Sequence, residues 1–117
     1  MDNVKDDRYY LKKIITDLKF LIDHTSGKTK EEIEKNELLI DSIMFRIIQI
    51  SENNNKLSDQ FKASHKDVPW LAIKGMRNRI VHDYGYVDLT VVYDTVINGI
   101  PDMYEKLKSI ADAEHNN

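Results

Sequence analysis

The middle of the chain carries four side chains that could together bind a phosphate and move a proton: Arg77, Asn78, His82 and Tyr84. A histidine exchanges protons near neutral pH, so His82 could take a proton from a ribose 2′-hydroxyl and return one to a leaving oxygen. The planar guanidinium of Arg77 matches phosphate oxygens and could stabilise the extra negative charge of a transition state. Arginine and histidine at this spacing, R-x4-H, therefore suggest metal-independent RNA cleavage through attack by the 2′-oxygen.

The element that must position these residues is a helix predicted from Pro69 to about Val81. Proline fits the first turn of a helix, where its missing N–H costs nothing. At 100° per residue, three apolar residues share one face that must point to the core: Ile73, Met76 and Ile80. Arg77 is expected at the edge of this core stripe.

Asn78 and His82 are four residues apart and are expected on the opposite face, toward solvent. On a regular helix Arg77 and His82 would be about 140° apart, too far to act on one atom. They can converge if the helix loosens before His82, which Gly85 makes plausible, or if a second chain completes the site. The spacing alone also permits purely structural roles, with Arg77 bonding helix carbonyls and His82 acting as a C-terminal cap.

The rest of the chain is predicted to form helices that support this segment. A first helix from Val4 to about Thr25 has an apolar stripe, acidic residues near its start and Ser26-Gly27 at its end. Thr29 and Glu32 form a capping-box pattern that opens a second long helix, which Asn53-Asn54-Asn55 should stop. Ser58 should cap one or two further helical turns.

A last long helix is predicted from Asp88, and Pro101 inside it should kink the helix or split it. The tail, from about residue 113 to 117, is expected to fray. No alternating strand pattern occurs. The predicted architecture is all-α: one domain over residues 1–117, an up-and-down bundle of four main helices plus a short one.

Composition and charge indicate which kind of ligand and which cellular location to expect. The 117 residues carry a net charge of −3, but residues 62–82 contain five lysines and arginines against one aspartate. A basic segment on an acidic body suits a localised anionic ligand, although a solvated basic helix face is an equal alternative. No apolar run is long enough to span a membrane, and the N-terminus has no signal-peptide pattern, so a cytoplasmic location is expected.

No cofactor or metal ion is expected. The sequence has no cysteine, and its histidines are scattered with no metal-binding spacing: His24, His65, His82 and His115. Trp70 and four tyrosines near the helix stripes are interpreted as core or core-edge residues.

Residues 68–84, V-P-W-L-A-I-K-G-M-R-N-R-I-V-H-D-Y, resemble the signature of the HepT-like family, the small HEPN-fold ribonuclease toxins of prokaryotic toxin–antitoxin pairs. The resemblance extends over about residues 38–110. It includes I-I-Q-I-S-E at 47–52, where Ser51 replaces a common glycine, and the kinked last helix around Ile100-Pro101.

This resemblance implies a homodimer in which two R-x4-H motifs face one cleft that takes RNA. By position, Arg77 would bind phosphate and stabilise charge, His82 would be the general acid and base, and Asn78 would support the site. Tyr84 matches the tyrosine that receives AMP from a minimal nucleotidyltransferase antitoxin, which silences the toxin. A bulky, negatively charged nucleotide there would oppose RNA binding. Two alternatives remain: a catalytically inert HEPN module that binds a nucleotide or a protein, and a structural helical adaptor.

Overall fold

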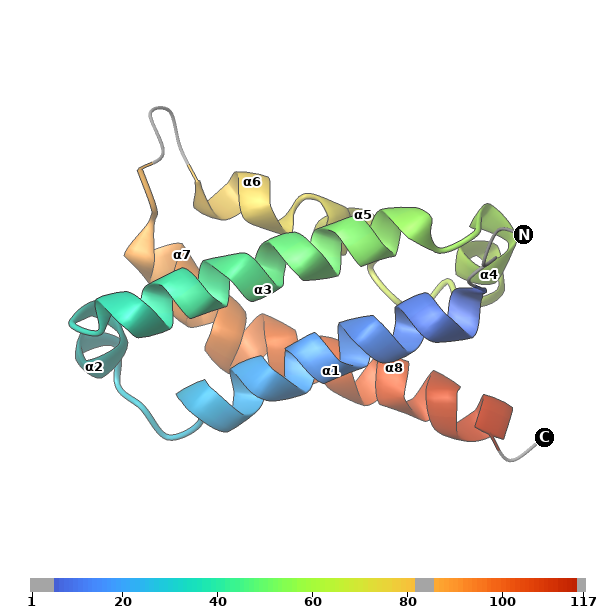
Figure 1. Ribbon diagram of the computed structural model, residues 1–117, viewed down its shortest axis with the longest axis horizontal. Coiled ribbons are helices and arrows are strands. Elements are labelled where there is room, and N and C mark those ends of the chain that lie inside the picture. Colours follow the sequence, from blue (N-terminus) through green and yellow to red (C-terminus); the bar gives the residue numbers. More distant parts are fainter. Residues whose placement is uncertain (1–5, 82–85, 116–117) are drawn as a thin grey trace, which may run out of the picture.

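The computed structural model describes residues 6–81 and 86–115, and within these ranges the chain is helical (Figure 1). The elements in chain order are α1 (Asp7–Thr25), α2 (Lys30–Glu34), α3 (Glu37–Lys56), α4 (Asp59–Ser64), α5 (Trp70–Lys74), α6 (Met76–Ile80), α7 (Leu89–Asp94), the π-helical turn η2 (Thr95–Gly99) and α8 (Ile100–His115). The predicted all-α bundle is confirmed. None of the described helices is both long and apolar enough to cross a membrane.

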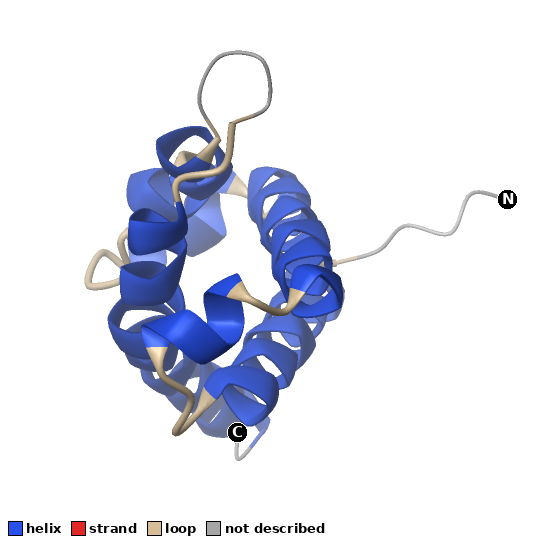
Figure 2. Cartoon of the chain, turned by 90° about the vertical axis from the view of Figure 1, so that its left-hand side faces the viewer, coloured by secondary structure: helices blue, strands red, loops and turns tan. Residues whose placement is uncertain are grey.

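The long helices α1, α3 and α8 form the body of the bundle, with α1 packed against both of the others. Viewed from one end (Figure 2), the short α2 lies across the bundle, where it contacts α3 and α7. Each long helix contributes one buried apolar stripe, and the buried side chains of all elements meet in one core. Burial of these stripes is the main source of stability for the helices.

The first helix is close to the prediction. It begins at Asp7, and the side chain of Asp6 accepts a hydrogen bond from the Tyr9 N–H as the N-cap. The predicted start of this helix, Val4, lies outside the described residues. After Ser26 the chain turns at Gly27, whose φ of 77° is a conformation that glycine adopts without strain.

The predicted second helix is two helices. The capping box is present, because Thr29 and Glu32 bond each other's backbone N–H groups, and the Thr29 N–H holds the pKa of the Glu32 carboxyl below its usual value. Helix α2 nevertheless ends at Glu34. Asn36 then caps a new helix by accepting from the Leu39 N–H, since asparagine satisfies an N-terminal donor well.

The three asparagines do not stop α3, which continues to Lys56. Asn53 and Asn54 are buried, and their amides bond backbone carbonyls instead of unwinding the helix. The small helix after them begins as predicted, with Ser58 accepting from the Phe61 N–H at the start of α4.

The last predicted helix is interrupted ahead of Pro101, as expected. Asp88 caps α7. The Ile100 N–H then donates to the Thr95 carbonyl, five residues back, which makes the π-helical turn η2. Proline has no N–H with which to continue the regular helical hydrogen bonds. The wider π-helical turn before Pro101 accommodates the missing bond. Helix α8 continues to His115, past residue 113 where fraying was expected.

Candidate active site

Trp70, the first residue of α5, fixes the position of the segment that carries the site. The indole Nε1–H of Trp70 donates to two carbonyls near the end of α4, Lys62 O at 3.1 Å and His65 O at 2.9 Å. The Trp70 ring also packs edge-on against Phe61, with the ring centroids 5.9 Å apart. Trp70 is therefore a partly buried core residue with a satisfied N–H, as the sequence predicted, and it fixes where α5 starts.

A polar edge of α3 holds both ends of α5. The Asn54 amide donates to Trp70 O at 3.2 Å, and the Ser51 hydroxyl donates to Lys74 O at 2.9 Å. These carbonyls belong to the first and last residues of α5. Ser51 and Asn54 were not predicted as site residues. The polar end of α3, Ser51 to Asn55, gave no signal that singled out these two residues.

The predicted helix over 69–81 is broken at Gly75 into α5 and α6. The Arg79 guanidinium reaches back across this break and donates to Ala72 O at 2.8 Å. A side chain therefore satisfies a carbonyl near the C-terminal end of α5, where a positive charge is also favoured. The carbonyl-bonding role that the sequence allowed for Arg77 is filled by Arg79.

Beyond the break, Met76 and Ile80 are fully buried and fix α6 against the core together with Ile73 of α5. The three-residue core face was predicted correctly. Arg77 was expected at the edge of that face, but it is exposed. The exposure follows from α6 itself, because Met76 and Ile80 point to the core and Arg77, one residue after Met76, is turned about 100° away from it.

Arg77 and Asn78 project together from α6. The Arg77 guanidinium donates to Asn78 Oδ1 at 3.3 Å, and both side chains are exposed. This long hydrogen bond joins the guanidinium to an uncharged amide oxygen, so Asn78 does not neutralise the charge of Arg77. An exposed guanidinium of this kind can donate two hydrogen bonds to the oxygens of a phosphate.

Helix α6 ends at Ile80, one residue earlier than predicted. Val81 is extended and pairs with Val87 as an antiparallel bridge, and the Asp88 N–H donates to Ile80 O at 2.8 Å. These contacts bring the two ends of the intervening segment together beside α6. His82 and Tyr84, the other predicted site residues, lie outside the described residues.

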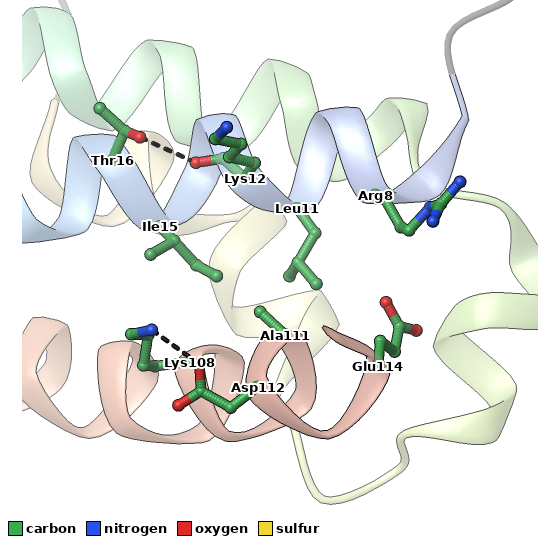
Figure 3. A pocket seen from close by; sticks show the side chains of 9 residues that line it. All are labelled: Arg8, Leu11, Lys12, Ile15, Thr16, Lys108, Ala111, Asp112 and Glu114. Atoms are coloured by element: carbon green, nitrogen blue, oxygen red, sulfur yellow. Dashed lines mark hydrogen bonds and ion pairs between the residues drawn. The ribbon is translucent and has the colours of Figure 1, made fainter. Parts of the chain in front are cut away.

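One cavity of the protein lies away from the described residues of the site. A space of about 500 Å³ opens between α1 and α8 (Figure 3), and its lining includes Arg8, Lys12 and Lys108 over apolar residues such as Leu11. Arg77 and Asn78 do not line it. One of its basic groups is already neutralised, because Lys108 Nζ lies 2.7 Å from Asp112 Oδ1. We therefore assign the candidate site to α6 and not to this cavity.

Over residues 6–81 and 86–114, no group of three or more histidine, aspartate or glutamate side chains is arranged to hold a metal ion. The side chains of α6 that could take part in a reaction are the guanidinium of Arg77 and the amide of Asn78.

The comparisons with known proteins agree on one family. Residues 14–110 match the profile of a family described as ribonuclease HepT-like. A candidate RNase of Caldanaerobacter subterraneus subsp. tengcongensis is 30% identical over 111 residues, covering 95% of this chain and 99% of that protein. A candidate RNase of Methanocaldococcus jannaschii is 26% identical over 106 residues, covering 91% and 88%. A candidate ribonuclease HepT of Thermococcus cleftensis is 34% identical over 62 residues, covering 50% and 56%. No solved structure matches the chain.

Proposed function

This chain belongs to the HepT-like ribonuclease family, and we propose that it is the toxin of a toxin–antitoxin pair, a metal-independent endoribonuclease that works as a homodimer in the cytoplasm. Arg77 and His82 carry the reaction, and Asn78 supports Arg77. The observation that carries this proposal is the exposed guanidinium of Arg77, oriented by Asn78 on a helix that two buried residues hold in place.

The proposed reaction needs only proton transfer and charge stabilisation. His82 accepts the proton of a ribose 2′-hydroxyl as the 2′-oxygen bonds to phosphorus, and the bond from phosphorus to the 5′-oxygen breaks. The leaving 5′-oxygen receives a proton from the imidazolium, which gives a 2′,3′-cyclic phosphate and a 5′-hydroxyl. Arg77 binds the non-bridging oxygens and stabilises the charge that grows on them.

Tyr84 is proposed as the point of control. A nucleotidyltransferase antitoxin would transfer AMP to its hydroxyl, which places a bulky anion two residues from His82. Added negative charge and bulk would oppose phosphate binding at Arg77. The intact mass of the protein after co-expression with such a partner tests this step: a mass unchanged from that of the protein expressed alone would exclude it.

A second candidate function rests on the same exposed Arg77 but involves no catalysis. An exposed arginine fork beside an amide could also hold the phosphate of a nucleotide in an inert binding module. Such a module would retain nucleotide binding and would leave RNA intact, so RNA cleavage separates the two functions.

The test is cleavage of total RNA by the purified protein in excess chelator. Arg77→Ala and His82→Ala should each lower the rate of cleavage by at least about 100-fold, because each removes a group needed in the transition state. Arg8→Ala is the matched control, since Arg8 is an exposed arginine on α1 that pairs with Asp6. Full activity of Arg77→Ala, or a requirement for added metal, would contradict the proposal.

A further inference from the structure

A large aromatic side chain is exposed close to the candidate site. Tyr86 is 66% exposed, more than any other phenylalanine, tyrosine or tryptophan among the described residues. Phe45 and Tyr9 follow at 57% and 37%, and the remaining described rings of these types are at least partly buried. A ring left in water gives up the stabilisation that its burial would provide. The exposed ring of Tyr86 therefore calls for a role outside the core.

The backbone beside α6 turns this ring outward. Val81, directly after α6, pairs with Val87 as an antiparallel bridge, and the Asp88 N–H donates to Ile80 O at 2.8 Å. The side chains of Val81 and Val87 both pack against the core. Successive side chains of a paired, extended segment point to opposite sides. Tyr86, one residue before Val87, therefore points away from the core, in agreement with its exposure.

Tyr86 is close enough to Arg77 for both to contact one RNA strand. The Val81 N–H donates to Arg77 O at 2.9 Å, so the Cα atoms of these two residues are one helical turn, about 6 Å, apart. The paired Cα atoms of Val81 and Val87 are about 5 Å apart, and Tyr86 is about 3.8 Å further along the chain. The Cα atoms of Arg77 and Tyr86 are therefore at most about 15 Å apart. Because both side chains are long, a phosphate bound by one and a base stacked on the other can belong to neighbouring nucleotides.

The ring and the positive charges near it are the combination that binds unpaired RNA. Lys74, Arg77 and Arg79 are exposed on α5 and α6. Sites for single strands combine such a basic surface, which follows the backbone, with an aromatic side chain on which a base stacks. A base inside a duplex is already stacked on both of its faces, so an aromatic side chain can stack only on a base that is unpaired and turned outward.

We propose that Tyr86 is a base-stacking residue, whose ring stacks on an unpaired base of the RNA strand that Arg77 holds by a phosphate. This inference rests on the proposed function for the identity of the ligand as RNA, and it adds a preference for single strands over duplexes. The two residues contact different parts of a nucleotide. Arg77 needs the phosphate and no base, whereas Tyr86 needs the base and no charge.

The experiment measures the binding of two labelled probes of equal length and charge to the full chain at low salt, by fluorescence anisotropy. One probe is oligoadenosine, and the other is an abasic ribose phosphate chain. His82→Ala is the background, so that the RNA stays intact. Tyr86→Ala should weaken the binding of oligoadenosine at least about fivefold and leave the binding of the abasic chain unchanged. Arg77→Ala should weaken the binding of both probes by the same factor, because it removes a phosphate contact.

Three comparisons separate stacking from a structural effect. Tyr86→Phe and Tyr86→Trp keep an aromatic ring and should retain the affinity for oligoadenosine within about twofold. Tyr9→Ala removes an exposed tyrosine near the start of α1, at the end of the bundle away from α7, and should leave the binding of both probes unchanged (Figure 1). A duplex of the same length should bind equally well with and without the Tyr86 ring.

Unchanged binding of oligoadenosine by Tyr86→Ala, or equal weakening of both probes, would overturn the inference. Loss of affinity in Tyr86→Phe and Tyr86→Trp as well would also overturn it, because an aromatic ring is then not what the site requires. The proposed activity is judged by a separate readout. Wild-type protein that leaves RNA intact, with binding that still depends on Tyr86, would contradict the ribonuclease and not the stacking.

Discussion

At the scale of single residues, the charge that most affects the fold is not in the candidate site. Asp17 on α1 is buried, and its Oδ1 accepts from the Arg46 guanidinium of α3 at 2.7 Å. The same guanidinium lies 3.9 Å from the centroid of the Phe20 ring. This pair joins the two longest neighbouring helices. A buried acid with one cationic partner is costly to leave unpaired.

Asp17→Ala should therefore lower the free energy of unfolding by about 3 kcal/mol, because Arg46 is left partly buried without its carboxylate. Denaturant unfolding measures the change. Asp23→Ala on the same helix is the control: Asp23 is exposed and pairs only with Lys19, so its loss should leave the unfolding midpoint unchanged. Equal effects of the two substitutions would show that burial of Asp17 is unimportant.

At the scale of elements, the apolar periodicity predicted where helices lie but not where they break. Ile73, Met76 and Ile80 were predicted on the core face and are buried there. The break at Gly75 depends on partners distant in the chain, such as Ser51, whose hydroxyl satisfies the Lys74 carbonyl. The break at Asn36 had a local signal, because asparagine is a common N-cap residue. The apolar spacing continues from Ile33 to Ile40 on either side of it, so the sequence suggested one continuous helix.

For the candidate site, too, the sequence predicted some features, and others depend on residues distant in the chain. The residue types and the R-x4-H spacing were visible in the sequence, and the family resemblance gave them roles. The sequence placed Arg77 at the edge of the core face, whereas its side chain is exposed, one residue round α6 from the buried Met76. The hydrogen bond from Arg79 was missed because its carbonyl partner, Ala72, is seven residues away across the break at Gly75.

The break at Gly75 gives a prediction about α5 and α6. An alanine Cβ at this position would meet Leu71 O at 3.5 Å and Arg79 Nη1 at 3.9 Å, which are ordinary contacts. Gly75→Ala should raise the free energy of unfolding by about 0.5–1 kcal/mol, because it restricts the unfolded chain and favours the helix. A more continuous helix would shift α6 and with it the Arg77 guanidinium, so RNA cleavage should fall.

Gly99→Ala is the matched control for this variant. A Cβ at Gly99 would meet nothing within 4 Å, and the residue lies in η2, away from α6. It should stabilise the protein by a similar amount, about 0.5–1 kcal/mol, and leave cleavage unchanged. Thermal unfolding and the RNA assay together distinguish the outcomes. Loss of cleavage in both variants would attribute the effect to rigidity in general and not to the α5–α6 break.

At the scale of the whole molecule, the uneven charge determines how RNA should approach. The chain has a net charge of −3, yet the elements from α4 to α6 are basic. An acidic body repels RNA from most of the surface, while the basic segment attracts it to the candidate site. The cavity between α1 and α8 offers a competing basic surface, and a charge-specific experiment can separate the two.

Cleavage by this protein should weaken steeply with salt, because each phosphate contact releases counterions. About four contacts to single-stranded RNA predict a loss of binding on the order of 10- to 100-fold between 50 and 200 mM salt. Lys66→Gln, at an exposed position before α5, should reduce the slope of log affinity against log salt by about 0.7. Lys12→Gln, in the α1–α8 cavity, should leave the slope unchanged. Fluorescence anisotropy with a labelled RNA and the inactive His82→Ala protein as background, which retains the phosphate-binding Arg77, measures both slopes. A smaller slope in Lys12→Gln alone would place the bound RNA in the cavity instead.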